Sequence, residues 1–454
     1  MPIPSPDGMG HIVIASPPIA RFRLLVRLRR ELVRRGHRVT LLATESAQAT
    51  FWRHQVGELT TVDEARTEDP ALAAAVAAIA SRHRLGPRRS RQLARRAAGL
   101  CRWLADANPD LVLFHAERTP TNACLQHLAA QAGIAVLWTG DGLLPGTMQV
   151  DDLGLDGDAS CRRWTARDFR VVTPDRALLD ASLAHGLAAP APFELPAPPV
   201  TVPPLRERLR DAARLALTGD WRGAGHALHA WREALPTAPV DAAFAGHDPR
   251  GAGNGPSVVV LLQRADDPAL RLDCEDAPGH AELLRHAAAA AAALDPRARL
   301  AVLADDDLQQ GLRARCAALP RALLVPMAAA PTWLATTAAV ITVNHRLAGL
   351  ALACGTPVVH LGHGLFDTAG VTTPSTLATL PADLVRAARR DRRALRRRVL
   401  SWLLRHGHVW CAADAPNHNG MLGLLQVVEQ RLAGPVAPRP LPYRAGPTWP
   451  LAST

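Results

Sequence analysis

Residues 11–42 read HIVIASPPIARFRLLVRLRRELVRRGHRVTLL, and this stretch points to the fold class of the chain. Residues 11–15 form a short apolar run that predicts a buried strand, and Ser16-Pro17-Pro18 ends it. Apolar side chains then recur at helical spacing over 19–35, Gly36 is placed to end that helix, and 38–42 predicts a second strand. A strand, a helix and a strand in this order indicate a β–α–β unit of a parallel sheet.

The same alternation continues along the chain in two blocks. In the first block, helical patterns at 70–105 and 121–131 alternate with predicted strands at 111–114 and 134–138. The second block has predicted strands at 257–262, 300–303, 322–325, 340–343 and 357–361, again separated by helical patterns. We therefore predict an α/β fold of two Rossmann-like, doubly wound domains.

Proline-rich stretches set the predicted domain boundaries. Seven prolines fall within residues 190–204, which is typical of an extended linker, and helical patterns follow at 205–234. The prediction is an N-terminal domain at 1–189, a linker and helical connection at 190–256, a C-terminal domain at 257–435 and a Pro-rich tail at 436–454.

The composition excludes several classes of protein. The 454 residues are 48% hydrophobic and 20% charged, which excludes a disordered chain. The seven cysteines are scattered and none has CxxC spacing, so neither a zinc site nor a disulfide framework is indicated. No apolar run approaches the ~18–20 residues that span a bilayer. We expect a cytoplasmic protein that uses neither a metal nor a cofactor.

A segment of the second block carries the strongest motif, Val343-Asn-His-Arg-Leu-Ala-Gly349, and a Gly-rich loop follows at 362–372. Asn344 and His345 lie where a strand leads into a helix, and free backbone N–H groups at such a turn attract phosphate. Arg346 can add a bidentate contact to an anion, and Gly362 allows a ligand to approach the backbone. The alternative is an ordinary strand–helix connection with an Asn cap.

A second candidate site follows the predicted strand 134–138. Asp141 lies between two glycines at the carboxyl end of that strand, where a carboxylate can face a cleft as a nucleophile or a base. The alternative is a simple turn, because Asp141-Gly142 is a common turn dipeptide. The acidic string at 151–158 lacks the spacing of a calcium loop, and we expect it to be a solvated loop.

These two segments resemble the capsule-polysaccharide synthesis family of retaining β-Kdo glycosyltransferases of Gram-negative bacteria. The resemblance rests on Asp141-Gly-Leu-Leu-Pro-Gly146, Asn344-His-Arg, Gly349-Leu-Ala-Leu352, Gly355-Thr-Pro-Val358 and Gly362-His-Gly-Leu-Phe-Asp-Thr-Ala-Gly-Val-Thr372. Weaker similarities are Leu262-Gln263 and Arg405-His-Gly-His408. The family's Lys-x-His-Pro segment is replaced by Ala304-Asp-Asp-Asp307, whose carboxylates would repel a phosphate unless an Arg intervened.

The resemblance implies a GT-B-like glycosyltransferase with a CMP-Kdo donor and an anionic glycan or glycolipid acceptor. It implies that Asp141 is the nucleophile, with Gly142 and His406 in acceptor or supporting positions. The nucleotide and donor would be bound by residues of the second domain, namely Gln263, Asn344, His345, Arg346, Gly362, His363 and Asp367. A transferase that uses another nucleotide sugar, or an inactive homologue that binds a glycan or a protein partner, remains an alternative.

The charge raises the question of partners. All 52 basic residues are Arg, the net charge is +11, and eight Arg fall within each of 21–38, 81–102 and 386–398. These clusters are either solvated helix faces or a surface for an anionic membrane or polysaccharide. Nucleic acid is disfavoured, since aromatic residues are only 4% and no binding signature is present. The first strand is not followed by GxGxxG, which argues against an NAD-dependent enzyme.

Overall fold

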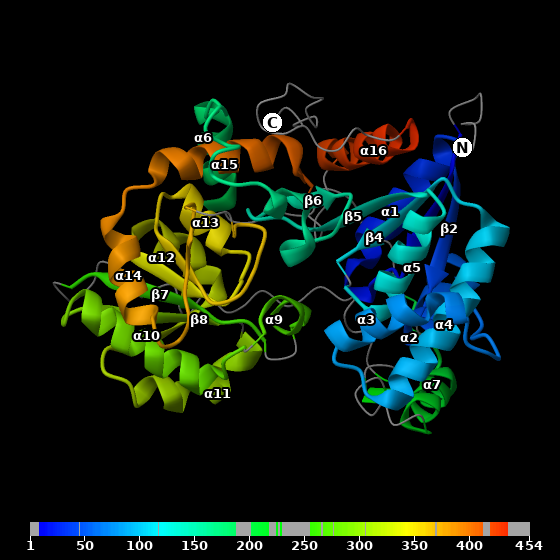
Figure 1. Ribbon diagram of the computed structural model, residues 1–454, viewed down its shortest axis with the longest axis horizontal. Helices are drawn as coiled ribbons and strands as arrows, with labels where there is room; N and C mark the ends of the chain where they lie inside the picture. Colours follow the sequence, from blue (N-terminus) through cyan, green and yellow to red (C-terminus); the bar gives the residue numbers. More distant parts are fainter. Residues whose placement is uncertain are drawn as a thin grey trace.

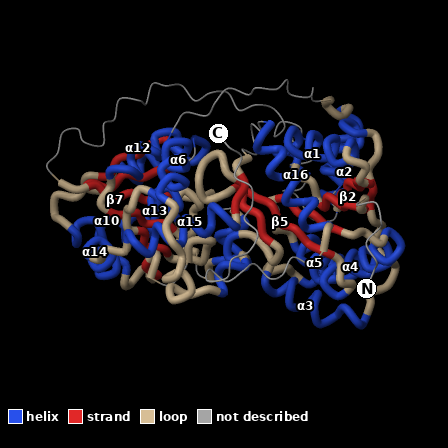
Figure 2. Tube along the Cα trace, turned by 90° about the horizontal axis from the view of Figure 1, so that it is seen from above, coloured by secondary structure: helices blue, strands red, loops and turns tan. Residues whose placement is uncertain are grey.

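The computed structural model describes residues 9–44, 46–116, 118–187, 201–217, 224–225, 228, 255–264, 267–275, 277–304, 306–367, 370–411 and 418–434. Two α/β units lie side by side in Figure 1, each with its own sheet. Seen from above in Figure 2, the strands fall into two groups with helices around each. The predicted α/β fold of two Rossmann-like domains is confirmed.

The first sheet has the strand order β13-β6-β5-β4-β1-β2-β3. The strands are β1 (His11–Ala15), β2 (Arg38–Ala43), β3 (Thr60–Thr61), β4 (Leu111–His115), β5 (Ala135–Asp141), β6 (Met148–Asp151) and β13 (His408–Val409). The five neighbouring strands β5, β4, β1, β2 and β3 are parallel. Strands β6 and β13 are added antiparallel at one edge. The β–α–β unit predicted from residues 11–42 forms β1, the helix that follows it and β2, and β2 lies next to the edge strand β3.

Helices cover both faces of the first sheet because side chains alternate along its strands. Ile12 and Ile14 face one core, formed with α1 (Phe22–Arg34), α2 (Ser46–Val56) and α16 (His418–Leu432). Val13 and Ala15 face the other core, formed with α3 (Ala73–Arg82), α4 (Pro87–Ala107) and α5 (Pro120–Gln131). This alternation with period two is what a two-sided parallel strand requires.

The second sheet is entirely parallel, with the order β12-β11-β10-β7-β8-β9. Its strands are β7 (Ser257–Leu261), β8 (Arg299–Ala304), β9 (Ala322–Pro326), β10 (Ala339–Thr342), β11 (Val358–His360) and β12 (Thr373–Pro374). Its helices are α9 (Pro268–Asp273), α10 (His280–Leu294), α11 (Asp306–Ala317), α12 (Ala330–Thr336), α13 (Ala348–Ala353), α14 (Leu380–Arg389) and α15 (Arg393–His406). Helices α10 and α14 cover one face, and α12, α13 and α15 cover the other.

The chain crosses between the domains four times: to the second at α6 (Arg176–Leu187), back to the first at α7 (Leu205–Leu217), to the second again at β7 and to the first at β13. Helix α6 packs against α15, α13 and α12 of the second domain, although residues 1–189 were assigned to the first. Strand β13 pairs with β6, and α16 packs on the first sheet, although 257–435 was assigned to the second domain. Apolar contacts made by Phe169, Leu178 and Leu179 with the core of the second domain explain the first crossing.

Within the predicted linker at 190–256, the structure describes 201–217, with helix α7 (Leu205–Leu217), and a few further residues. The remainder of that segment and the predicted tail at 436–454 lie outside the described residues. In the ranges that the structure covers, no helix combines the length and the apolar character needed to cross a bilayer.

Candidate functional site

The carboxyl ends of the central strands of both sheets meet where the two domains touch. Asp141 is the last residue of β5, and it contacts Arg346, which follows β10. Arg118 follows β4, and it contacts Asp273 at the end of α9, the helix after β7. In open α/β sheets, ligands bind at the carboxyl ends of the strands. This boundary is therefore the candidate site.

Asp141 is bound by one arginine from each domain. Arg21, in a short 3-10 helix at Ile19–Arg21, places its Nη2 2.7 Å from Asp141 Oδ2. Arg346 donates a hydrogen bond to the same oxygen. The Asp141 side chain is 26% exposed, against 16% for Arg21 and 50% for Arg346. The carboxylate that the sequence singled out and the arginine predicted to contact phosphate are thus in direct contact.

The two arginines differ in exposure. Arg21 is largely buried, and burial lowers its pKa. Packing of protein atoms around Arg346, and to a lesser extent the charge of Arg21, lowers the pKa of Arg346 to about 10, although half of its side chain remains exposed. Both guanidinium groups stay charged at neutral pH. Because a buried charge attracts an anion more strongly than a solvated one, Arg21 in particular is suited to contact an anionic ligand.

The turn after Asp141 is held by backbone contacts that exclude a side chain at residue 142. The Gly142 N–H donates to the Thr147 carbonyl at 2.9 Å, and a Cβ at Gly142 would lie 2.2 Å from Thr147 Oγ1. From the second domain, helix α13 approaches so closely that a Cβ on Gly349 would lie 2.6 Å from Leu143 Cβ. Gly142 and Gly349 therefore allow the tight turn and the close domain contact that place Asp141.

His408 supports this turn. The Leu143 N–H donates to His408 Nε2 at 3.1 Å, so Nδ1 carries the proton and donates to the Leu403 carbonyl at 3.0 Å. His406 lies against the ring of Trp402, with ring centroids 5.1 Å apart. Within Arg405-His-Gly-His408, β13 turns residue 408 toward β6 and the Asp141 turn, and the role predicted for His406 stays a prediction.

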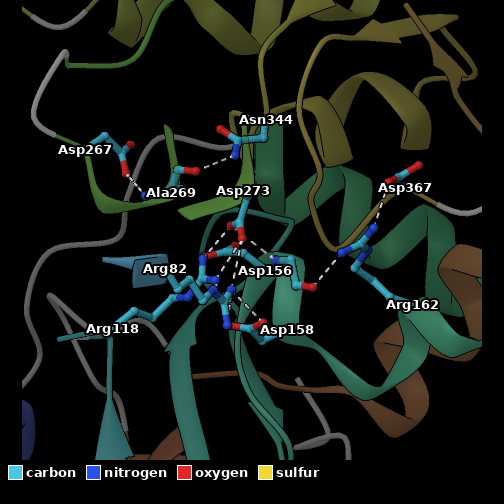
Figure 3. A network of polar contacts seen from close by, with 11 residues as sticks. Arg82, Arg118, Asp156, Asp158, Arg162, Asp267, Ala269, Asp273, Asn344 and Asp367 are labelled. Carbon is cyan, nitrogen blue, oxygen red and sulfur yellow. Dashed lines mark hydrogen bonds and ion pairs between the residues drawn. The ribbon is translucent and has the colours of Figure 1, made fainter. Parts of the chain in front are cut away.

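Asn344 and Gln263 come together at the ends of β10 and β7. The Asn344 N–H donates to Gln263 Oε1 at 3.3 Å, and Asn344 Nδ2 donates to the Ala269 carbonyl of α9 at 3.0 Å (Figure 3). Asn344 is 6% exposed, and its Oδ1 is buried without a partner among the described residues. An unsatisfied buried acceptor of this kind is costly unless a ligand or water completes it.

His345 has a local structural role in the same turn. Its N–H donates to Thr342 Oγ1 at 2.9 Å, and its Nδ1 accepts from the Leu347 N–H at 3.2 Å. Burial lowers the pKa of His345 to about 4, so its imidazole is neutral at physiological pH. His345 therefore shapes the backbone that carries Asn344 and Arg346.

The Gly-rich loop joins this region through Gly362, His363 and Asp367. The His363 N–H donates to the Asp273 carbonyl at 2.7 Å, and its Nδ1 lies 2.6 Å from Asp367 Oδ2. Arg162 also reaches Asp367, with Nη2 3.2 Å from Oδ2 (Figure 3). A Cβ at Gly362 would lie 3.1 Å from the Asp273 carbonyl oxygen, so the loop packs directly on α9. His363 remains 59% exposed and accessible to a ligand.

An ion-pair cluster joins the two domains beside this loop. Arg118 donates to both carboxylate oxygens of Asp273, and its Nη2 lies 2.7 Å from Asp158 Oδ2 (Figure 3). Arg82 adds a contact to Asp158 at 2.8 Å. The side chains of Arg118 and Asp273 are only 6% and 2% exposed. Burial alone would lower the pKa of Arg118, but Asp273 and Asp158 raise it above its ordinary value.

The acidic string at 151–158 is therefore not the solvated loop that we expected. Asp151 is buried and accepts hydrogen bonds from the backbone of Leu153 and Ser160 and from Ser160 Oγ. Asp158 forms the ion pairs with Arg118 and Arg82 described above. These carboxylates contact arginines distant in sequence and backbone N–H donors. Such contacts offset the free-energy cost of burying a charge.

His115, at the end of β4, is a buried neutral histidine. Its Nδ1 donates to Thr139 Oγ1 at 2.8 Å, since the Thr139 hydroxyl itself donates to the Phe114 carbonyl. Burial, and then the charge of Arg21, lowers the pKa of His115 to about 3. Its Nε2 is a buried acceptor without a partner among the described residues.

The structure thus brings together all the predicted donor-side residues and Asp141 at one domain boundary, and it adds His408 at the Asp141 turn. Arg21 and the pair Arg118–Asp273 were missed. Arg21 belonged to a cluster considered only as surface, and nothing local to residues 118 and 273 indicates their pairing. Asp305 and the side chains of Asp306 and Asp307 lie outside the described part of the chain. No group of His, Cys, Asp and Glu able to hold a metal is present in that part.

Solved structures with a similar fold have low sequence identity. No curated protein matches the chain in sequence. The glycotransferase of kitacinnamycin is 16% identical, covers 93% of this chain and 99% of its own, and has a TM-score of 0.39. SnogD, a glycosyltransferase from Streptomyces nogalater, is 16% identical over 93% and 100%, with a TM-score of 0.37. The UDP-GlcNAc 2-epimerase from Neisseria meningitidis is 11% identical over 93% and 100%, with a TM-score of 0.37. These likenesses concern the fold alone.

A family model matches the part of the chain that carries Asn344, Arg346 and the Gly-rich loop. The match extends over residues 240–406, which include nearly all of the second sheet and end at α15. Its description is "Capsule polysaccharide biosynthesis protein". Residues 240–406 are therefore similar in sequence to that family, as the motifs in this part of the chain indicated.

Proposed function

We propose that this protein is a glycosyltransferase of capsule or surface polysaccharide biosynthesis. The observation that carries the proposal is the contact of Asp141 with Arg21 and Arg346, one from each domain, at the carboxyl ends of both sheets. Arg346 lies within the segment that matches the capsule family. A carboxylate beside two arginines can act on an anionic sugar donor, because the arginines bind the anion while the carboxylate faces its reacting carbon.

The more specific proposal is transfer of a Kdo-like sugar from a CMP-activated donor with retention. Such a donor has a carboxylate and a phosphate on its anomeric carbon, and these two anions match the two arginines. In the first step a carboxylate oxygen of Asp141 bonds to the anomeric carbon, and CMP leaves with the electrons of the bond that breaks. In the second step an acceptor hydroxyl loses its proton and displaces Asp141. Two displacements restore the original configuration.

We assign donor binding to the second domain. The unsatisfied Asn344 Oδ1 and the exposed ring of His363 offer polar contacts next to the turn that carries Arg346. Gly362 keeps the loop close to α9, Asp367 fixes the ring of His363, and Gln263 fixes the backbone of Asn344. His345 is assigned a positioning role, and Gly142 and His408 hold the Asp141 turn.

For partners, we propose an anionic glycan or glycolipid acceptor and a cytoplasmic location at the surface of the inner membrane, and no nucleic acid. The Arg clusters of the sequence support this only in part, because several members serve internal contacts. Arg21 binds Asp141, Arg82 binds Asp158, and the buried Arg396 donates to the Gly355 carbonyl.

The experiment that tests the proposal is a calorimetric titration of the protein with CMP, UDP, GDP and NAD. We expect CMP to bind selectively, and the Arg346→Gln variant to bind it at least about tenfold more weakly, since a charge-assisted contact is lost. Selective binding of another nucleotide would keep the glycosyltransferase proposal and refute the CMP donor. Binding of CMP without any hydrolysis or transfer would instead favour an inactive, ligand-binding homologue.

A further inference from the structure

Helix α7 is fixed to the first domain by polar contacts along one side. Thr50 Oγ1 of α2 donates to Asp211, and His54 Nε2 lies 2.8 Å from Glu207 Oε2. Gln55 donates to the Thr201 carbonyl at 2.6 Å and accepts from its N–H at 3.1 Å. Both acidic residues of α7 therefore point toward α2, and these contacts determine which face of the helix points away from the protein.

The outward face of α7 carries a stripe of exposed apolar side chains. Leu205, Leu209 and Leu217 are 58%, 51% and 82% exposed, and the exposed Ala213 lies between the last two. A spacing of four residues places these side chains on one face of a helix. Eight large apolar side chains are exposed among the described residues, and four of them, including Val202, lie within 202–217. The apolar exposure of this protein is thus concentrated on one element.

A second stripe beside the first is purely basic. Arg206, Arg210 and Arg214 are all exposed and are again spaced by four residues. Of the acidic side chains of α7, Asp211 is buried against α2, and Glu207 binds His54 but still interacts with the charges of Arg206 and Arg210, so the three arginines outnumber the one nearby acid. A helix with a leucine stripe next to an arginine stripe has the charge and polarity of an interfacial membrane helix. A purely solvated helix face would not collect leucines.

We propose that the outward face of α7 docks the protein onto a bilayer surface rich in anionic lipid. The leucines enter the boundary between head groups and acyl chains, and the arginines contact lipid phosphates. The docking helix lies outside the three Arg clusters evident in the sequence. The inference extends the proposed function by giving access to a lipid-linked acceptor, but it stands on residues that have no contact with Asp141.

The test is flotation of the full-length protein with vesicles of phosphatidylcholine, with and without phosphatidylglycerol. We expect binding only with phosphatidylglycerol, and a steep loss of binding as salt increases. The variant L205Q/L209Q/L217Q should bind at least about tenfold more weakly, and R206Q/R210Q/R214Q should lose a similar factor. Glutamine keeps helix propensity, so thermal unfolding should stay close to that of the wild type.

Matched control variants replace the same kinds of exposed side chain at other positions. V33Q/V171Q/L422Q changes three exposed apolar residues, and R389Q/R390Q/R392Q changes three exposed arginines of a sequence cluster. Both controls should bind vesicles as the wild type does. Equal binding to uncharged vesicles, no binding at all, or wild-type binding by the leucine variant would overturn the proposal. So would a concentration-dependent dimer that the leucine variant abolishes, because a second copy would then cover this face.

The test of membrane docking can fail or succeed independently of the test of the proposed function. The D141N variant should float with the vesicles as the wild type does, whereas the α7 variants should still bind CMP in solution. Loss of vesicle binding in D141N, with its fold intact, would contradict the assignment of docking to α7. Loss of CMP binding in the α7 variants would show that the two regions are not independent.

Discussion

Arg346, four residues beyond the end of β10, donates a hydrogen bond to Asp141, the last residue of β5, across the boundary between the two domains. The two residues are 205 positions apart in the sequence, and Arg21 shares the same carboxylate oxygen. A donor anion and Asp141 therefore compete for the same arginines. We expect anion binding to release the carboxylate for attack, so that Arg346 couples donor binding to exposure of the nucleophile.

Replacing Asp141 with Asn should separate donor binding from turnover. Transfer should fall by at least about a thousandfold, because an amide does not act as the nucleophile. CMP should bind as tightly as to the wild type or more tightly, since the competing negative charge is removed from Arg346. Calorimetry and a transfer assay on the same preparation measure the two effects.

The control for this variant is Asp180→Asn, which makes the same chemical change at an exposed position of α6. It should leave both quantities unchanged. If Asp141→Asn retained wild-type turnover, Asp141 would not be the nucleophile. A parallel loss of CMP affinity would indicate instead that the carboxylate orders the arginines for binding.

Replacing Gly349 with Ala should disturb the contact between α13 and the Asp141 turn. The added Cβ would lie 2.6 Å from both Leu143 Cβ and the Leu143 carbonyl oxygen, so the turn must shift. We expect a loss of about 1–3 kcal/mol in the free energy of unfolding, as for other overpacked contacts, together with reduced turnover. Urea unfolding and the transfer assay provide the two measurements.

Gly311→Ala on α11 is the matched control, because a Cβ there meets no atom within 4 Å. Alanine in a helix is favoured over glycine by about 0.5–1 kcal/mol, so this variant should be slightly more stable than the wild type and fully active. Equal behaviour of the two alanine variants would mean that α13 and the turn are not in tight contact.

Local sequence patterns were sufficient for the strands and for part of the site. The apolar runs at 11–15 and 257–262 correspond to β1 and β7 because a strand buried on both faces needs a continuous apolar run. Asp141 and Arg346 could both be selected because each follows a predicted strand, and parallel strands present their carboxyl ends at one edge of a sheet. The contact between them depends on how the domains face each other, which no local pattern encodes.

The elements that sequence reasoning missed all depend on long-range pairing. Strand β13 has only two residues, and its pairing with β6 brings together positions more than 250 apart. Among 52 arginines, nothing distinguishes Arg118, the partner of Asp273, from those on exposed helix faces. His406 and His408 are separated by one residue, and only the strand pairing decides which one reaches the Leu143 amide.

Replacing Arg118 with Met should destabilise the protein strongly. It would leave Asp273, whose side chain is 2% exposed, as a buried carboxylate without its main partner. Loss of one member of a buried ion pair costs about 3–5 kcal/mol in the free energy of unfolding. The double variant Arg118→Met/Asp273→Asn should recover part of this loss, because the uncompensated charge is gone.

Arg34→Met provides the comparison for Arg118. Arg34 pairs with Glu31 on α1 at 2.8 Å, but its side chain is 65% exposed. Loss of an exposed pair changes the free energy of unfolding by at most about 1 kcal/mol. Denaturant unfolding of the three variants tests this order, and a loss for Arg118→Met no greater than for Arg34→Met would contradict the role assigned to the buried pair.

His115 should make stability fall as the pH is lowered below about 6.5. Burial holds the pKa of His115 at about 3 in the folded protein, against 6.5 for an ordinary histidine. Below pH 6.5 the unfolded chain binds a proton that the folded protein does not, so stability is lost as pH falls from 6.5 toward 3. The His115→Gln variant lacks this proton-binding site. Between pH 7 and pH 5, the variant should therefore lose about 2 kcal/mol less of its free energy of unfolding than the wild type loses.

The measurement is urea unfolding at pH 7, 6 and 5 for the wild type, His115→Gln and His418→Gln. His418 lies at an exposed position at the start of α16. The His418 variant makes the same chemical change there and controls for the substitution itself. Because the test compares slopes, a constant loss from the missing contact with Thr139 does not affect it. Identical slopes for all three proteins would mean that His115 can be protonated within the folded structure.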